Sequence, residues 1–94
     1  MSEGIIKSGR KQSFTVLYKS AIEDKRLPLD ARGLLAIMVG LPEGWQYSVK
    51  GLAAYVGVSK DTIRRLLGKL EDVGYLTREQ THDENGHFAG NVYV

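Results

Sequence analysis

The sequence lacks cysteine entirely, and it also lacks long apolar runs. Without cysteine, disulfide bonds, thiolate zinc sites and cysteine nucleophiles are excluded. The longest nearly apolar stretch, residues 33–41, is far too short to cross a bilayer, and no segment resembles a signal peptide. We therefore expect one small cytoplasmic domain with no membrane partner. Because 94 residues without disulfides form only a modest core, dimerisation or attachment to a longer chain is also expected.

Residue groups that carry catalysis or bind metal are missing as well. There is no combination of serine, histidine and carboxylate typical of a nucleophilic triad, and no glycine loop that would cradle phosphate. His82 and His87 flank Asp83, but without a third ligand they indicate a cross-strand pair rather than a metal site. Residues 83–86 lack the ligand spacing of a calcium loop. The sequence therefore predicts no enzyme, no cofactor, no metal and no small-molecule substrate.

The net charge is only +2, but the charges are distributed unevenly. Residues 1–12 carry a balance of +2, residues 48–70 a balance of +4, and residues 71–94 a balance of −4. A basic middle and an acidic end favour electrostatic steering of a partner as well as solubility.

The N-terminal part of the chain is predicted to be an arm followed by a single domain. Residues 1–12 have no hydrophobic periodicity and predict a flexible basic arm, and residues 13–94 then form the domain. The run from Phe14 to Tyr18 is rich in β-branched and aromatic residues and alternates, which is typical of a short strand. Residues 19–25 are expected to form one or two helical turns.

Three later segments share a pattern that marks the start of a helix. In each, an apolar residue precedes a capping residue, and a second apolar residue follows the first by five positions, as in an N-cap with a hydrophobic staple. The three sets are Leu29, Asp30 and Leu34; Tyr47, Ser48 and Leu52; and Val58, Ser59 and Ile63. The helices should end before Pro42, at Gly57 and at Gly74, which gives lengths of about ten, eight and fourteen residues.

The residues after Gly74 predict a β-hairpin. They alternate as a strand does, and Asn85-Gly86 fits a type I′ turn before a returning strand at residues 87–94. The order of elements predicts a mainly α fold with a small β-sheet, a winged helix-turn-helix with a three-helix core and a C-terminal hairpin as the wing. Residues 14–18 are expected to add a third strand at the edge of the hairpin, and Trp45 is expected to plug the core beneath the helices.

Residues 49–68 have the composition that two helices joined by a short turn require. Ala53 provides a small residue where the helices cross, and Gly57 provides a residue that tolerates positive φ in the turn. The apolar residues expected to close the wedge between the helices are Leu52, Val56, Val58, Ile63 and Leu66.

The third helix, residues 60–73, has two different faces when its residues are spaced at about 100°. The core face holds Ile63, Leu66, Leu67 and Leu70. The exposed face holds Asp61, Arg64, Arg65, Gly68 and Lys69, with Lys60 and Thr62 at its margins.

The exposed face suits DNA. Arg64 and Arg65 can make bidentate contacts to guanine or phosphate, and the helix N-terminus at Ser59 suits a phosphate. Lys50 lies in the first turn of the preceding helix, within reach of a neighbouring phosphate. A solvated helix face is the alternative interpretation of these cations. Gly68 is either a site of close approach or a tolerated helical glycine.

Two segments resemble known bacterial proteins. The segment KDTIRRLLGKLEDVGYL resembles the recognition helix and first wing strand of winged-helix regulators, including the GntR-like group. The upstream pattern resembles the N-terminal modules of Firmicute phage, plasmid and primosomal replication-initiation proteins. It is formed by Leu29, Ala31, Arg32, Gly33, Leu34, Leu35 and Trp45, and the resemblance covers residues 14–94.

The resemblance implies which residues contact DNA. They are Ser59, Lys60, Thr62 and Arg64, supported by Arg65 and Lys69. Asp61 departs from the family's pattern, and its carboxylate either stabilises the helix N-terminus or accepts a hydrogen bond from cytosine. The acidic wing tip, Asp83-Glu84, argues against insertion of the wing beside phosphates.

The sequence thus predicts double-stranded DNA binding through residues 60–73. The protein would be a transcriptional regulator or the DNA-binding module of a replication-initiation protein. It would act as a homodimer or as part of a longer replication protein. The alternative is a winged-helix module for protein–protein interaction without nucleic-acid binding, which the acidic hairpin and the low net charge favour.

Overall fold

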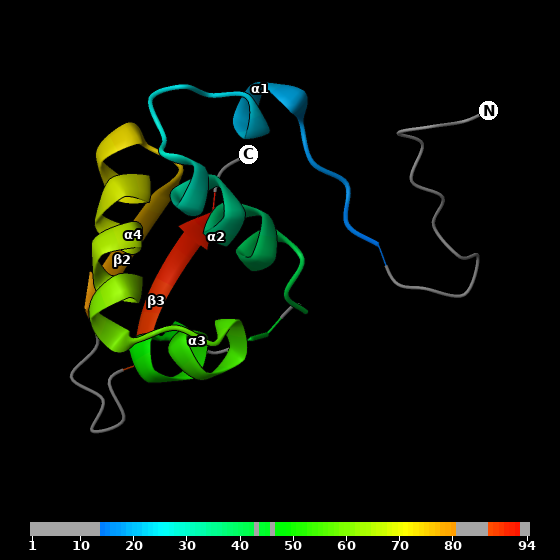
Figure 1. The fold of residues 1–94 in the computed structure, drawn as a ribbon. Coiled ribbons are helices and arrows are strands. Elements are labelled where there is room, and N and C mark those ends of the chain that lie inside the picture. Colours follow the sequence, from blue (N-terminus) through cyan, green and yellow to red (C-terminus); the bar gives the residue numbers. More distant parts are fainter. Residues whose placement is uncertain (1–13, 43, 46, 81–86, 93–94) are drawn as a thin grey trace.

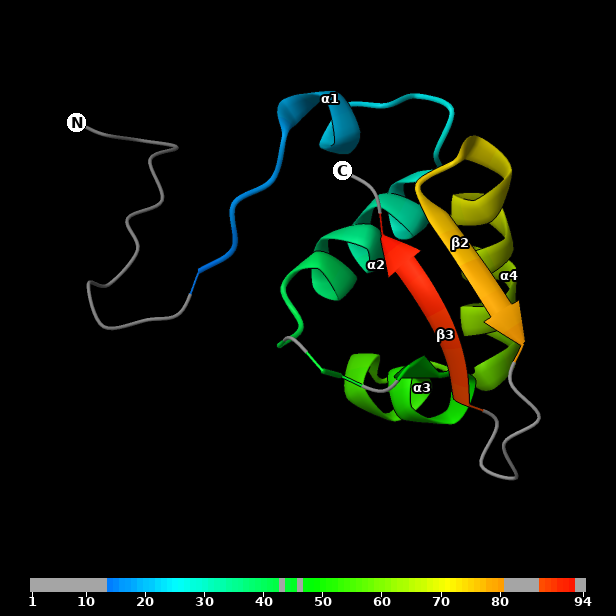
Figure 2. The ribbon, with the colours of Figure 1, turned by 180° about the vertical axis from the view of Figure 1, so that it is seen from behind.

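The computed structural model describes residues 14–42, 44–45, 47–80 and 87–92. The helices are α1 (Lys19–Ile22), α2 (Leu29–Val39), α3 (Val49–Val56) and α4 (Lys60–Val73), and the strands are β1 (Tyr47–Ser48), β2 (Leu76–Gln80) and β3 (His87–Val92). Figures 1 and 2 show α2, α3 and α4 on one side of β2 and β3. The molecule is a mainly helical winged helix-turn-helix fold, as the sequence predicts.

The sheet is antiparallel and has the order β1-β3-β2. Leu76 pairs with Val92 at one end of β2, and Tyr47 of β1 pairs with Phe88 of β3. The central strand β3 therefore joins the segment before α3 to the segment after α4.

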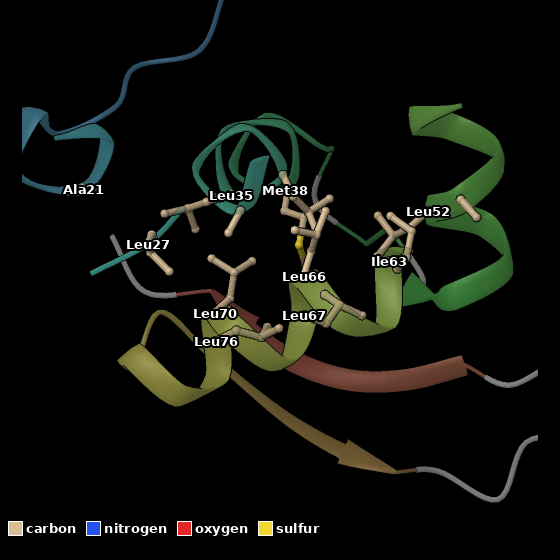
Figure 3. Close-up of a cluster of buried hydrophobic side chains, with 13 residues drawn as sticks. Ala21, Leu27, Leu35, Met38, Leu52, Ile63, Leu66, Leu67, Leu70 and Leu76 are labelled. Carbon is tan, nitrogen blue, oxygen red and sulfur yellow. The ribbon is translucent and has the colours of Figure 1, made fainter. Parts of the chain in front are cut away.

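The core lies mainly among α2, α3 and α4 (Figure 3), and Leu76 of β2 joins it. The predicted core face of α4 is confirmed, because its four apolar residues are at most 4% exposed. They meet the buried face of α2, which consists of Ala31, Leu34, Leu35 and Met38, as well as Leu52 and Ala53 of α3 and Leu76 of β2. Burial of this leucine-rich cluster is the main apolar contribution to folding.

The predicted ends of α3 and α4 are confirmed. The Ser48 side chain accepts a hydrogen bond from the Gly51 N–H at 2.8 Å and caps α3. Gly57 and Gly74 follow α3 and α4 with φ of 85° and 96°, in the left-handed region that favours glycine. Local signals are sufficient here because each helix end is closed by residues a few positions away.

The predicted cap of α2 is wrong. The helix begins at Leu29, so Pro28 occupies the N-cap position and Asp30 lies inside the first turn. Proline fixes its own φ near the value found here, −63°, and its carbonyl accepts the first helical hydrogen bond, from the Arg32 N–H. Leu29 is 77% exposed, so it forms no staple with Leu34.

The predicted strand at residues 14–18 is also wrong. These residues form no strand, and the third strand of the sheet is β1, whose two residues immediately precede α3. Ser48 is extended, as an N-cap residue usually is, and together with Tyr47 it pairs with β3.

Two further apolar predictions fail. Val58 is 39% exposed rather than buried in the wedge, because the turn at Gly57 brings the Val58 N–H back to the Ala53 carbonyl and leaves the side chain outside. Trp45 is only half-buried and does not join the core; its ring lies edge-on to that of Tyr55, with centroids 5.5 Å apart.

Several predictions fall outside the described residues: the arm at 1–12, His82, the acidic pair Asp83-Glu84 and the Asn85-Gly86 turn. In the described ranges, every helix is too short or too polar to serve as a membrane-spanning segment. Within the same part of the chain, no cluster of three histidine, aspartate or glutamate side chains is arranged to hold a metal ion.

Candidate nucleic-acid interface

The turn between α3 and α4 sets the direction of the candidate recognition helix. The Ala53 carbonyl accepts hydrogen bonds from the N–H groups of Gly57 and Val58, at 2.9 and 3.1 Å, which closes the end of α3. Ala53 itself is 7% exposed, so the predicted small residue does lie in the packed region between the helices. Two helices joined within three residues and crossing at a small side chain form the predicted helix pair.

The N-terminus of α4 carries two linked hydroxyl groups. The Ser59 hydroxyl accepts a hydrogen bond from the Thr62 N–H at 3.1 Å, which confirms the predicted cap. It also donates to Thr62 Oγ1 at 2.9 Å. Ser59 is exposed, and the first N–H groups of α4 point out at this end without helical partners. This arrangement suits a phosphate oxygen.

Both arginines of α4 form ion pairs at the protein surface. Arg64 Nη1 lies 2.8 Å from Asp61 Oδ1, one turn away on the same helix, and Arg65 Nη2 lies 2.9 Å from Asp30 Oδ2 on α2. The two arginine side chains are 57% and 53% exposed, so they remain accessible to a partner. The hydrogen bond from Arg65 lowers the pKa of Asp30 below its ordinary value.

The remaining predicted cations are exposed lysines. Lys60 and Lys69 lie on α4, and Lys50 lies in the first turn of α3. Among the described residues, no carboxylate lies within ion-pairing distance of these three ammonium groups. The exposed surface of α4 thus carries four cations, Lys60, Arg64, Arg65 and Lys69, against the carboxylates of Asp61 and Asp72, and Lys50 adds a cation at the start of α3. This surface has the excess of positive charge that nucleic acid requires.

Comparison with known families identifies the kind of domain that carries this surface. The family model of the helix-turn-helix domain matches residues 25–76, which is more than half of the chain. The chain belongs to the helix-turn-helix domain family. Neither the curated proteins nor the solved structures contain a significant match. Membership of this family supports DNA as the partner of the chain.

Outside α4, the fold is held together by a partly buried carboxylate that the sequence did not reveal. Asp24, in the segment between α1 and α2, accepts hydrogen bonds from Arg26 Nη2 at 2.7 Å and from the Tyr75 hydroxyl at 2.8 Å. Its side chain is 9% exposed. The hydrogen bond from Arg26 has the largest effect and the one from Tyr75 the next largest, and both hold the pKa of Asp24 well below its usual range. The hydrogen bond to Asp24 also raises the pKa of Tyr75. Asp24 thus connects the segment before α2 to the residue before β2.

Two other arginines of the helix-turn-helix domain have structural roles. Arg32 donates to the carbonyls of Ile22 and Leu27, at 3.0 and 3.1 Å, and so fixes the segment that enters α2. Arg78 of β2 lies 2.6 Å from Glu71 of α4 and so connects the strand to the helix before it. The Arg32 bonds and the Arg78 ion pair are thus both made within the protein.

Proposed function

We propose that this helix-turn-helix domain binds double-stranded DNA through α4, as a transcriptional regulator or as the DNA-binding module of a replication-initiation protein. The carrying observation is the division of α4 into two faces. One face buries four apolar residues, and the other exposes two arginines and Lys69 next to a serine-capped N-terminus.

The proposed binding mode places α4 in the major groove. Arg64 and Arg65 would contact guanine edges or phosphates, and Ser59, Lys60 and Thr62 would lie at the end of the helix that approaches the backbone. Lys50 and Lys69 would contact flanking phosphates. Arg64 and Arg65 would exchange their carboxylate partners, Asp61 and Asp30, for DNA on binding, because each ion pair is exposed and therefore weak.

Fluorescence polarisation with labelled duplexes tests this proposal. We expect binding at low salt, and a decrease of affinity with salt whose slope becomes shallower by about one unit for each phosphate-contacting cation removed. Arg64→Ala and Arg65→Ala should both weaken binding. Lys25→Ala removes one exposed cation outside α3 and α4, so it is the charge-matched control and should bind as the wild type does.

Two results would contradict the proposal. Equal effects of Lys25→Ala and the arginine variants would show that only net charge matters. Absence of binding at micromolar protein and low salt would favour the alternative, a module for protein–protein interaction. Selection of bound duplexes from a random pool would then define the target sequence and separate a specific regulator from a general binder.

A further inference from the structure

We propose that residues 14–18 pair with the same segment of a second copy of this chain, forming a two-stranded antiparallel ribbon centred on Val16. The proposal is independent of DNA binding. It starts from the strand-forming sequence that the sheet of its own chain does not use.

The side chains of this segment alternate between two environments. Phe14, Val16 and Tyr18 are 83%, 78% and 66% exposed, whereas Leu17 between them is half-buried. Thr15 is exposed overall, but its hydroxyl lies against the end of α2, where a side chain on Gly40 would come within 2.6 Å of its Oγ1. Alternation of this kind is the geometry of a strand with one face against the protein and an apolar face in water.

The backbone of the segment also bears on pairing. Among the described residues, no hydrogen bond involves the N–H or C=O groups of residues 14–17. Figures 1 and 2 show the segment running out from α1 away from β2 and β3. An extended apolar segment with free backbone groups is a template for pairing with another strand.

The sequence of the segment favours its own copy as that strand. Read in either direction, an aromatic residue is followed two positions later by Val16 and two positions later by another aromatic residue. In an antiparallel pair centred on Val16, Phe14 of one copy therefore lies opposite Tyr18 of the other. The segment has no charge, so pairing opposes no like charges. A two-fold interface requires this kind of self-complementary surface.

The exposed apolar area indicates how strongly the two copies should associate. The three exposed side chains present on the order of 400 Å² per chain, or roughly 800 Å² for two copies. Stable dimers bury about 1,200–2,000 Å², so we expect a weak dimer that dissociates in the micromolar range or above.

Disulfide crosslinking tests the register directly, because the chain has no cysteine of its own. Opposed residues of an antiparallel pair have Cα atoms about 4.5–5.5 Å apart, which is within the range that a disulfide spans. Val16→Cys should therefore form a covalent dimer under mild oxidation. Tyr18→Cys lies in the same stripe but opposite Phe14, so it should crosslink much more slowly, as should Tyr55→Cys, an exposed residue of α3.

Sedimentation of charge variants provides a second test without covalent chemistry. Val16→Lys and Val16→Glu should each be monomeric, because each places two like charges opposite one another, and an equimolar mixture should restore a dimer. Circular dichroism checks that these exposed substitutions leave the helices folded. Equal crosslinking of all three cysteine variants, or a wild type that stays monomeric up to about 1 mM, would overturn the proposal.

Discussion

Ser59 is the residue at which stability and DNA binding can be separated most cleanly. Its hydroxyl both accepts from the Thr62 N–H and donates to Thr62 Oγ1, so it caps α4 through two hydrogen bonds. Ser59→Ala removes the cap. We expect the free energy of unfolding to fall by about 1 kcal/mol, within a range of about 0.5–2. In a domain of this size such a loss lowers Tm by about 4–8 °C.

Two replacements keep the cap but differ in charge. Asparagine and aspartate are both good N-cap residues, so Ser59→Asn and Ser59→Asp should unfold close to the wild-type temperature. Only Ser59→Asp adds a negative charge where we place a phosphate. A unit charge 4 Å from another changes the energy by about 1 kcal/mol even in bulk water, so duplex affinity should fall by at least about fivefold.

The assay is a pair of measurements on the same three variants. Thermal unfolding followed by circular dichroism gives the stability order, and polarisation titration with a labelled duplex at two salt concentrations gives the affinity order. If Ser59→Asp binds duplex as tightly as Ser59→Asn, the N-terminus of α4 does not face phosphate, and the proposed orientation of the helix is refuted.

Three other predictions follow from single contacts. Asp30→Asn frees Arg65 of α4 from its ion pair and should raise duplex affinity by about 1.4- to 5-fold, the range expected for an exposed ion pair. Asp72→Asn removes the same charge from α4 itself and should raise the affinity less in the same polarisation assay. Gly68→Ala should raise the free energy of unfolding by about 1 kcal/mol in denaturant titration, because its new Cβ meets no atom within 4 Å; a large loss of duplex affinity would instead assign Gly68 to close DNA contact. Tyr75→Phe removes a hydrogen bond that lowers the pKa of Asp24. The lowered pKa makes Asp24 stabilising above about pH 4, and this contribution is lost as the pH falls further. Tm should therefore fall less steeply between about pH 4 and pH 2 in the variant, and an unchanged slope would contradict this role.

The parts of the fold that could be predicted are those decided by neighbouring residues. Ser48 and Ser59 cap helices through N–H groups three positions ahead, and Gly57 and Gly74 end helices through their own φ values. The apolar spacing in α4 is also a local pattern, and all four of its predicted core residues are buried.

The parts that could not be predicted depend on residues far apart in the chain. Asp30 and Arg65 are 35 positions apart, and Asp24 and Tyr75 are 51 positions apart, so no local pattern relates them. The segment at residues 14–18 has the composition of a strand, but the edge of β3 is occupied by β1. Strand propensity indicates that a segment can join a sheet, but competition between distant segments decides which strand it pairs with.

The pairing of β1 with β3 also determines when the domain becomes complete during synthesis. Tyr47 and Phe88 are neighbours across these strands, so the entire helix pair lies inside a loop that closes only at β3. A ribosome releases residues 47–73 before it releases 87–92, and α4 therefore leaves the exit tunnel with one apolar face still lacking the sheet. Loop closure of this length is entropically modest, so the last strand should dock quickly once it is free. The nascent chain thus passes through an interval in which α4 exists without the strands that complete its packing.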